Sequence, residues 1–297
     1  MLGGRTGRDG ADDCDGNGRR GCLPPPISSH TRKEREEYEE MLLAPAAGSG
    51  SLPSGTGKEF MEKTKYPYIG KSDQQKGLPQ PPLELPPDPG KPVMDLPLPE
   101  LLDIPLLDLR IAIESRRSTR AYLHEPITRE ELSFLLWSTQ GVQAVHGTQA
   151  TFRTVPSAGA RHAFETYLLV SDVEGLEPGL YRYLALSHRL QQLDTDPTLP
   201  HRITVACFNQ QFILRSGAVF LWTAVPYRMT WRYGERGYRD LHLDAGHVCQ
   251  NLYLAGEAVG CGVCAIAAFD DDAMDALLGI DGENQFLIYL ATVGKKE

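Results

Sequence analysis

Hydrophobic and polar positions follow a helical rhythm in several stretches beyond residue 106. Apolar residues recur every three or four positions in "LLDLRIAIESR" (106–116) and in "TREELSFLLWSTQG" (128–141). In the second stretch Thr128 and Glu131 form a capping box, and Gly141 suits a C-terminal end. The spacing therefore predicts helices here, and it predicts further helices in "LPHRITVACFNQQ", "LHLDAGHVCQNLYLAGEAVG" and "DDDAMDALLGI".

Apolar runs rich in β-branched and aromatic residues lie between these helices. The runs predict strands in "FETYLLVSDV", "GLYRYLALSHRLQQL", "GAVFLWTAVP", "CGVCAIAAF" and "QFLIYLATVG". Helices and strands mix without a strict βα repeat, so we expect an α+β fold with a mixed or antiparallel central sheet flanked by helices. The segment "VQAVHGTQATFR" (142–153) reads as a loop and is our candidate for a substrate-facing lid.

Proline separates the chain into three parts. Of the 22 prolines, 16 precede position 106. Residues 1–60 hold few large apolar groups and are expected to be a disordered extension, apart from a short helix in "HTRKEREEYEEMLLA"; Met61 is an alternative start. Residues 61–105 form a proline-rich strap, extended over 77–105, which we expect to lie across a surface or a partner subunit. Residues 106–297 form the compact domain.

Composition and charge narrow the class of protein. The chain of 297 residues has 41% hydrophobic residues and a formal net charge of −9, which disfavours a nucleic-acid partner. No apolar run approaches the length of a membrane span, and the N-terminal arginines precede no apolar segment of the kind that a signal peptide needs. Four of the six cysteines lie in apolar surroundings, so we predict a cytoplasmic protein with small buried thiols at Cys207, Cys249, Cys261 and Cys264.

Several motifs resemble known sites without meeting their requirements. "LPSGTGKEF" has Leu52 where a phosphate-binding loop needs its first glycine and Glu59 where it needs Ser or Thr. "VPSAG" has Val155 in place of the first glycine of a nucleophile elbow. Cys261 and Cys264 have no second pair, and His242 and His247 would point about 140° apart on a helix. The sequence therefore predicts neither these activities nor a metal site.

The segment "RRSTRAY" (116–122) carries the strongest chemical signal. It follows the predicted helix that ends near Ser115, so its three arginines lie on the turn that leaves that helix. Guanidinium groups grip phosphate in a planar, bidentate manner, and Ser118 and Thr119 add short neutral donors. A surface cluster of salt bridges is the alternative.

Three further segments favour a ligand over a salt-bridge cluster. "PSAGARH" (156–162) and "GCGVC" (260–264) place small residues where backbone can approach a flat ligand, and "ATVGKKE" ends the chain with Gly294, Lys295 and Lys296. In this order and spacing, the segments resemble the flavin-dependent nitroreductase superfamily, most closely its SagB/ThcOx-type branch. The similarity extends over nearly the whole chain after residue 60.

The resemblance implies an intertwined two-fold homodimer that binds FMN at the subunit interface, with "LHLDAGHVCQNLYLAGEAVG" as the central dimer helix and the strap embracing the partner. It assigns phosphate and ring-edge contacts to Arg116, Arg117, Ser118 and Arg120. It assigns a segment that approaches the ring, commonly from the other subunit, to Pro156, Ser157, Ala158 and Gly159. It assigns the backbone near the reactive part of the ring to Gly260, Cys261 and Gly262, and the terminal phosphate contact to Gly294 and Lys295.

The implied activity is two-electron (hydride) transfer through bound flavin to or from a small organic substrate, with NAD(P)H as a candidate electron donor. Enzymes of the branch that oxidise azoline rings in modified peptides use a Lys-Tyr pair, and the corresponding place here is Arg232-Tyr233. Arginine stays protonated and is a poor base, whereas Tyr233 can relay a proton. A generic flavin oxidoreductase is therefore favoured over an azoline dehydrogenase, and a non-catalytic flavin-binding accessory subunit is the alternative from another class.

Overall fold

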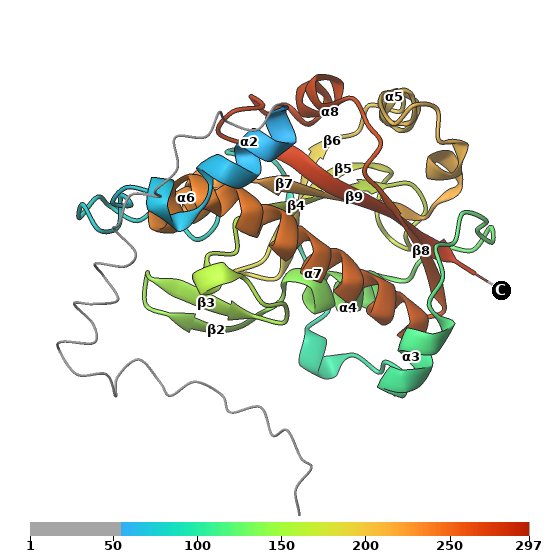
Figure 1. Cartoon of the computed structure of the whole chain (residues 1–297). Coiled ribbons are helices and arrows are strands. Elements are labelled where there is room, and N and C mark those ends of the chain that lie inside the picture. The colour runs from blue at the N-terminus through green and yellow to red at the C-terminus, as the bar shows by residue number, and fades with distance from the viewer. Residues whose placement is uncertain (1–54, 297) are drawn as a thin grey trace, which may run out of the picture. The chain divides into compact units, whose positions relative to one another are not determined.

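The computed structural model describes residues 55–296, and their core is one seven-stranded sheet (Figure 1). Its strand order is β1-β6-β5-β4-β7-β9-β8, and each neighbouring pair is antiparallel. The expected α+β class is confirmed, and the sheet is antiparallel throughout. The strands are β1 (Val93–Asp95), β4 (Phe164–Val170), β5 (Gly179–Leu184), β6 (Arg189–Asp194), β7 (Ala218–Ala224), β8 (Cys261–Ile266) and β9 (Phe286–Lys295).

Helices cover both faces of the sheet, because the central strands are buried along their whole length. All seven residues of β4 and of β7 are buried, so successive side chains enter two different cores. One core packs under α4 (Arg129–Gln140), α6 (Pro226–Tyr233) and α7 (Gly237–Ala258). The other packs under α5 (Leu199–Ala206) and α8 (Asp271–Leu278). Two short helices, α2 (Thr56–Lys63) and α3 (Leu109–Ser115), precede this framework.

The capping box of α4 forms as the sequence predicts. The Thr128 side chain accepts a hydrogen bond from the Glu131 backbone N–H, and the Glu131 carboxylate accepts one from the Thr128 backbone N–H. Gly141 ends the helix for a steric reason, since a Cβ there would lie 2.4 Å from the Trp137 carbonyl oxygen. Its φ of −58° needs no glycine.

Two sequence-based predictions of local structure are wrong in detail. The stretch 179–193 is not one strand, because the chain turns back at Ala185–His188 and separates β5 from β6. The turn carries no glycine or proline, and instead His188 adopts a φ of +52° and bonds through its ring to Tyr183 and Ser133. The segment 142–153 is not a loop but a hairpin of β2 (Val142–His146) and β3 (Ala150–Arg153).

The proline-rich strap lies across its own chain, which is one of the two places that the sequence predicts for it. Leu78 accepts a hydrogen bond from the Trp231 indole, and Pro82 accepts one from Arg228. Arg228 and Glu165 form an ion pair at 2.5 Å with both side chains 2% exposed. The strap contains β1, which pairs with β6 at the edge of the sheet. Buried polar groups of the domain therefore determine the path of the strap.

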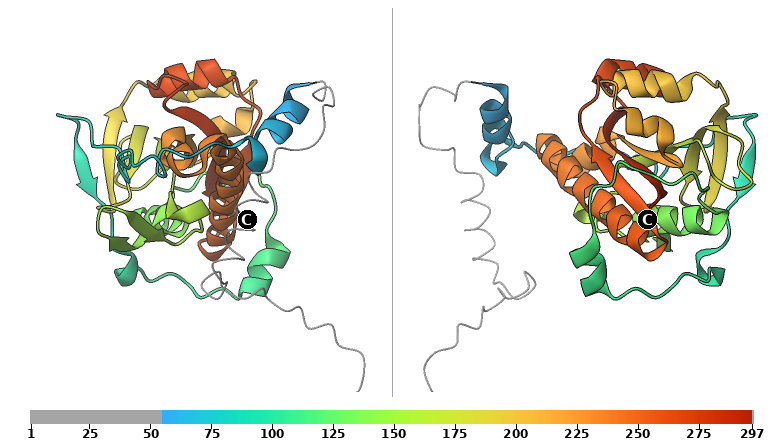
Figure 2. Two further views of the ribbon diagram at one scale, coloured as in Figure 1. Left: turned by 60° about the vertical axis from the view of Figure 1, so that its left-hand side comes forward. Right: turned by 90° about the vertical axis from the view of Figure 1, so that its right-hand side faces the viewer.

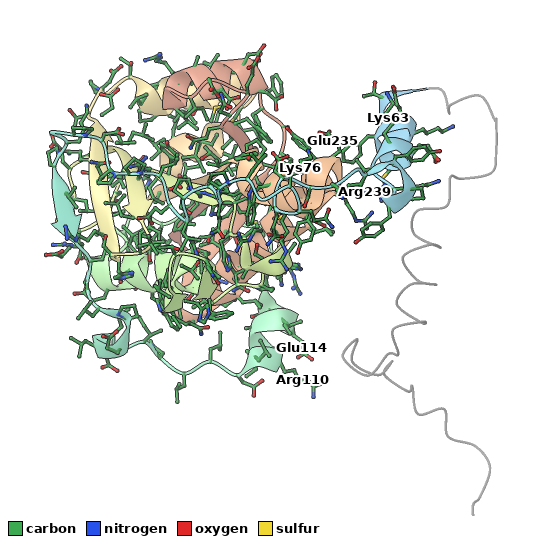
Figure 3. All side chains as sticks on the ribbon, turned by 90° about the vertical axis from the view of Figure 1, so that its left-hand side faces the viewer. Lys63, Lys76, Arg110, Glu114, Glu235 and Arg239 are labelled. Atoms are coloured by element: carbon green, nitrogen blue, oxygen red, sulfur yellow. The ribbon has the colours of Figure 1, made fainter. Side chains whose placement is uncertain are left out.

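Short helices lie near the two ends of α7 (Figure 2). Near its beginning, the Arg239 side chain (Figure 3) donates hydrogen bonds to the Met61 carbonyl of α2 and to Thr64, which follows that helix. Near its end, Ser115 of α3 donates to Glu257 at 3.0 Å. Helix α2 crosses the expected boundary at residue 60, so residues 56–60 are helical. The helix predicted in "HTRKEREEYEEMLLA" lies outside the described residues.

Candidate functional site

The segment "RRSTRAY" packs along the edge of the sheet, directly after α3. The Thr119 N–H donates to the Val263 carbonyl at 2.9 Å, and Ser118 forms a parallel bridge with the same residue. Farther along, the Leu123 N–H donates to the Lys295 carbonyl at 2.9 Å. The structure thus brings together three of the predicted segments. We call this group, residues 116–122, 260–263 and 294–296, the Gly260 cluster.

Two glycines of the Gly260 cluster make room for the chain's own side chains. A Cβ on Gly262 would lie 2.6 Å from Thr119, and one on Gly294 would lie 2.8 Å from the Tyr122 ring. Their small size is therefore explained by packing of "RRSTRAY" on β8 and β9. Gly260 differs, because its φ is +64° and a Cβ there would meet nothing within 4 Å. Cys261 is buried, and burial raises the pKa of its thiol to about 12.

Within the described part of the chain, the Gly260 cluster contains arginines without carboxylate partners and lysines with them. The guanidinium of Arg116 lies 5.1 Å from the Tyr253 ring centre, and that of Arg120 lies 5.7 Å from the Phe212 ring centre on another side of the sheet. Arg117 donates to backbone carbonyls beside it, at Glu114 and Arg116. Among the ion pairs of residues 55–296, none involves these three arginines.

Both terminal lysines, by contrast, have carboxylate partners. Lys295 pairs with Glu131 at the N-terminus of α4 and also donates to the Val259 carbonyl. Lys296 pairs with Glu257 at 2.6 Å. Lys295 therefore fastens the end of β9 to α4, and of its three N–H donors one is left for another acceptor.

A hydroxyl network supports the Gly260 cluster and was missed in the sequence. The hydroxyls of Ser118 and Tyr253 lie 3.0 Å apart, and Tyr253 also accepts the Ala265 N–H at 2.9 Å. The Tyr122 hydroxyl donates to the Thr119 carbonyl at 2.7 Å and lies 2.6 Å from the Thr292 hydroxyl. Burial raises the pKa of Tyr122, so this phenol stays protonated. No local motif marks Tyr253, and the contact of Tyr122 with Thr292 cannot be read from "RRSTRAY", because these partners come from distant segments.

The segment "PSAG" lies beside the start of α7. The Ala158 N–H donates to the Asp244 carboxylate at 3.2 Å, and the Ser157 hydroxyl accepts the His162 N–H at 2.9 Å. Asp244 is 4% exposed, its other carboxylate oxygen has no partner, and burial raises its pKa. Asp244 therefore positions the backbone of "PSAG".

Gly159 joins this segment to the Arg232-Tyr233 pair. Its φ is +56°, and a Cβ would lie 2.4 Å from the Tyr233 hydroxyl and 3.0 Å from Arg232 Nε. The Arg232 guanidinium lies 5.6 Å from the Tyr233 ring centre. Two segments that are 73 residues apart in the chain (232 minus 159) thus meet at one glycine. We call this group, residues 156–162, 231–233 and Asp244, the Gly159 cluster.

The two clusters do not meet within the chain. Asp244 holds the Gly159 cluster and Glu257 holds the Gly260 cluster, and both residues belong to α7. Thirteen residues (257 minus 244) separate them, which corresponds to about 20 Å along a helix. Four of the predicted segments therefore form two groups at opposite ends of α7.

A cavity of about 1150 Å³ borders the Gly159 cluster. The β2–β3 hairpin, the strap and the end of α6 line it, so the segment predicted as a lid does face a cavity, although as a hairpin. Next to it, burial and the guanidinium groups of Arg153 and Arg161 lower the pKa of His162 to about 3. His162 is therefore neutral near pH 7.

Two classes of feature are absent from the described part of the chain. Residues 55–296 contain no group of three or more His, Cys, Asp or Glu side chains that could hold a metal ion. Over the same residues, no helix has both the length and the apolar character needed to cross a membrane.

Comparison with known proteins shows which protein family this chain resembles. Residues 113–295 match the model of the nitroreductase family. A nitroreductase homologue of Methanocaldococcus jannaschii is 36% identical over 203 residues, which cover 68% of this chain and 97% of that protein. The trifolitoxin-processing protein TfxB of Rhizobium leguminosarum bv. trifolii is 31% identical over 136 residues, which cover 43% of this chain and 36% of that protein.

Among solved structures, a nitroreductase homologue of Anabaena variabilis has the same fold. It is 26% identical with a TM-score of 0.62, and the alignment covers 85% of this chain. The chain spans about half the length of that protein, with 50% covered.

Proposed function

Because the chain belongs to the nitroreductase family, we propose that it is an FMN-dependent oxidoreductase that transfers two electrons to or from a small organic substrate. The observation that supports the cofactor is the charge of the Gly260 cluster, which contains three arginines without a carboxylate partner among residues 55–296 as well as the exposed backbone of Gly260. FMN carries a phosphate of nearly two negative charges and a flat ring system, which such a donor set fits.

Each part of the Gly260 cluster has a role in this proposal. Arg116 and Arg117 bind the phosphate, and Ser118 adds a hydroxyl donor. Gly260 lets the ring approach the backbone, and the third N–H of Lys295 remains a donor for the cofactor. Gly262 and Gly294 act indirectly, because they allow "RRSTRAY" to lie close to the sheet. When bound, FMN supplies the two-electron chemistry, and the protein provides binding, orientation and exclusion of water.

The flavin site is completed by a second copy of the chain. Within one protomer the Gly159 cluster lies about 20 Å along α7 from the Gly260 cluster. In a two-fold dimer whose α7 helices pack antiparallel, the Gly159 cluster of each copy lies beside the Gly260 cluster of its partner. The exposed face of α7 supports this arrangement, since Leu243 is 63% exposed and Gly246 has open space around it. Leu109, Ile111 and Ile113 of α3 are also exposed.

At the other copy's flavin, Tyr233 is placed to donate or relay a proton. Its hydroxyl lies against Gly159, and its ring lies under the Arg232 guanidinium. Arg232 stays protonated and stabilises negative charge instead of accepting a proton. NAD(P)H is the proposed electron donor, and it would use the same open face of the site as the substrate.

A second candidate is an azoline dehydrogenase that acts on a modified peptide. The similarity to TfxB favours it, because that protein processes trifolitoxin. The Arg232-Tyr233 pair argues for the generic oxidoreductase, since an arginine cannot take the proton that a lysine at that place would.

The first test is the visible spectrum of freshly purified protein. We expect absorption bands of flavin, release of FMN on denaturation, and bleaching on anaerobic addition of NAD(P)H. Light scattering should give a dimer, and Leu243→Glu should produce a monomer that loses FMN. A colourless protein that takes up no added FMN would refute the proposal.

A further inference from the structure

The cavity beside the Gly159 cluster has an apolar side that faces solvent. Val145 of β2 and Phe152 of β3 line it and are 56% and 54% exposed. The strap contributes Pro81 and Pro82, and α6 contributes Trp231. Such a lining suits a planar apolar body, and the volume of about 1150 Å³ exceeds that of many small-molecule sites.

Two arginines bring positive charge to the same cavity. Arg161 is only 6% exposed; its Nε donates to the Gly159 carbonyl at 3.1 Å, and its Nη2 donates to the Gln149 carbonyl at 2.7 Å. Its guanidinium lies 5.5 Å from the Trp231 ring centre. Arg232 also lies close to Gly159, with its Nε 3.0 Å from the place that a Cβ of this residue would take. Both guanidinium groups are therefore fixed around one residue.

These two charges have no counter-ion of their own in the described chain. Neither Arg161 nor Arg232 takes part in an ion pair within residues 55–296. Burial and the neighbouring Arg232 lower the pKa of Arg161, as expected for two like charges held close together. Hydrogen bonds and ring contacts hold the two guanidinium groups in place against their mutual repulsion, and an anion bound between them would relieve that repulsion.

The acidic residue of the cavity lining stands apart from the arginines. Glu84 accepts the Leu186 N–H at 3.0 Å. Gln80, four residues earlier on the strap, bonds to the same Gln149 carbonyl as Arg161. Four residues of extended chain span about 12 Å. The cavity therefore has a cationic end at Gly159 and an acidic residue well removed from it.

We propose that this cavity binds a planar organic carboxylate, with Arg161 and Arg232 on the carboxylate and Val145 and Phe152 along the apolar body. Arginine matches a carboxylate in a planar, bidentate geometry, which a lysine would not. This inference rests on the proposed function in one respect: the acid that binds here is the substrate class of the flavin site.

Binding of benzoate and benzamide to the purified protein, measured by calorimetry, tests the inference. The two probes share a ring and differ in charge. We expect benzoate to bind about tenfold or more tightly than benzamide, as for a charge-assisted contact. Arg232→Gln should remove this preference. Arg202→Gln is the matched control, because Arg202 pairs with Asp196 at the start of α5, away from the cavity, and its loss should leave the preference intact.

Flavin content, read from the absorbance of the same samples, separates the alternatives. Equal affinity for the two probes, or an unchanged preference in Arg232→Gln, would overturn the carboxylate site. So would a loss of bound FMN in Arg232→Gln with benzoate affinity unchanged, since the guanidinium would then serve the cofactor. A colourless protein that still prefers benzoate through Arg232 would contradict the proposed function and support the carboxylate site. Arg161→Lys, which keeps the charge, should weaken benzoate binding without unfolding the protein.

Discussion

The two ends of α7 hold their clusters by different means. At the Gly159 cluster, buried charged groups hold the segments together: Asp244 and Arg161 are each less than one-tenth exposed, and so is the Arg228–Glu165 pair outside the cluster, where α6 meets β4. At the Gly260 cluster, close backbone packing of Gly262 against Thr119 holds the segments together, and both lysines of the cluster are paired with carboxylates. Of the three arginines without a carboxylate partner there among residues 55–296, Arg117 and Arg120 are exposed and Arg116 is half-buried.

Because of this difference, mutations at the two clusters should affect different properties of the protein. A buried charge that loses its partner destabilises the whole domain, whereas an exposed cation that loses its ligand costs the fold little. We therefore expect mutations near the Gly159 cluster to change the free energy of unfolding, and mutations of the arginines at the Gly260 cluster to change affinity for the cofactor.

The largest expected effect comes from Arg228→Met. It leaves the Glu165 carboxylate buried without its cation and frees the Pro82 carbonyl of the strap. We expect a loss of about 3–5 kcal/mol in the free energy of unfolding, measured by urea denaturation. The double variant Arg228→Met/Glu165→Gln should recover part of the loss. A loss below about 1 kcal/mol would show that the strap is not held by this pair.

The Gly159 cluster should also make the protein sensitive to acid. The pKa of His162 is about 3 in the folded protein, against 6.5 as its ordinary value. Because the folded state keeps this imidazole neutral, its contribution is complete above pH 6.5 and is lost as pH falls toward 3. The shift corresponds to roughly 3–5 kcal/mol over that window.

Thermal unfolding of wild type and His162→Gln between pH 7 and pH 4 checks the acid effect. The wild type should lose more stability over this window than the variant. Parallel curves for the two proteins would mean that His162 already carries its proton in the fold.

Most of the framework could be predicted from the sequence, because local signals and tertiary packing agree there. The capping box at Thr128, the buried strand at 217–226 and the long helix after 236 formed as the pattern predicts. The hairpin turn at His188 could not, since ring hydrogen bonds to Tyr183 and Ser133 replace the usual turn residues.

Prediction of the candidate site was less complete for a physical reason. Composition located "RRSTRAY" and the glycine segments, but it could not tell that Thr119 and Tyr122 fill the space beside Gly262 and Gly294. The sequence also offers no reason to single out Arg161, because its proposed binding role depends on its proximity to Gly159 and Arg232, which come together only in the fold. Contacts between distant segments leave no mark on either segment alone.

At the Gly260 cluster, Gly262→Ala should have an intermediate effect. The added Cβ would meet Thr119 at 2.6 Å, so "RRSTRAY" must move away from β8. We expect a loss of about 1–3 kcal/mol in unfolding free energy together with weaker FMN binding. Gly57→Ala, in α2 with nothing within 4 Å, is the control and should be neutral or slightly stabilising. Equal behaviour of the two variants would remove the packing explanation.

The smallest effect on stability is expected from Arg116→Gln, which tests the comparison most directly. Arg116 has no carboxylate partner in the described chain and its guanidinium lies over the Tyr253 ring, so the free energy of unfolding should change by less than about 1 kcal/mol. FMN affinity, measured by fluorescence titration, should fall about tenfold and depend less on salt, because one phosphate contact is lost. Arg110→Gln on α3, whose exposed pair with Glu114 is labelled in Figure 3, removes the same charge nearby and should change neither quantity. If Arg116→Gln instead lowered stability and left FMN affinity intact, the Gly260 cluster would be structural, like the other end of α7.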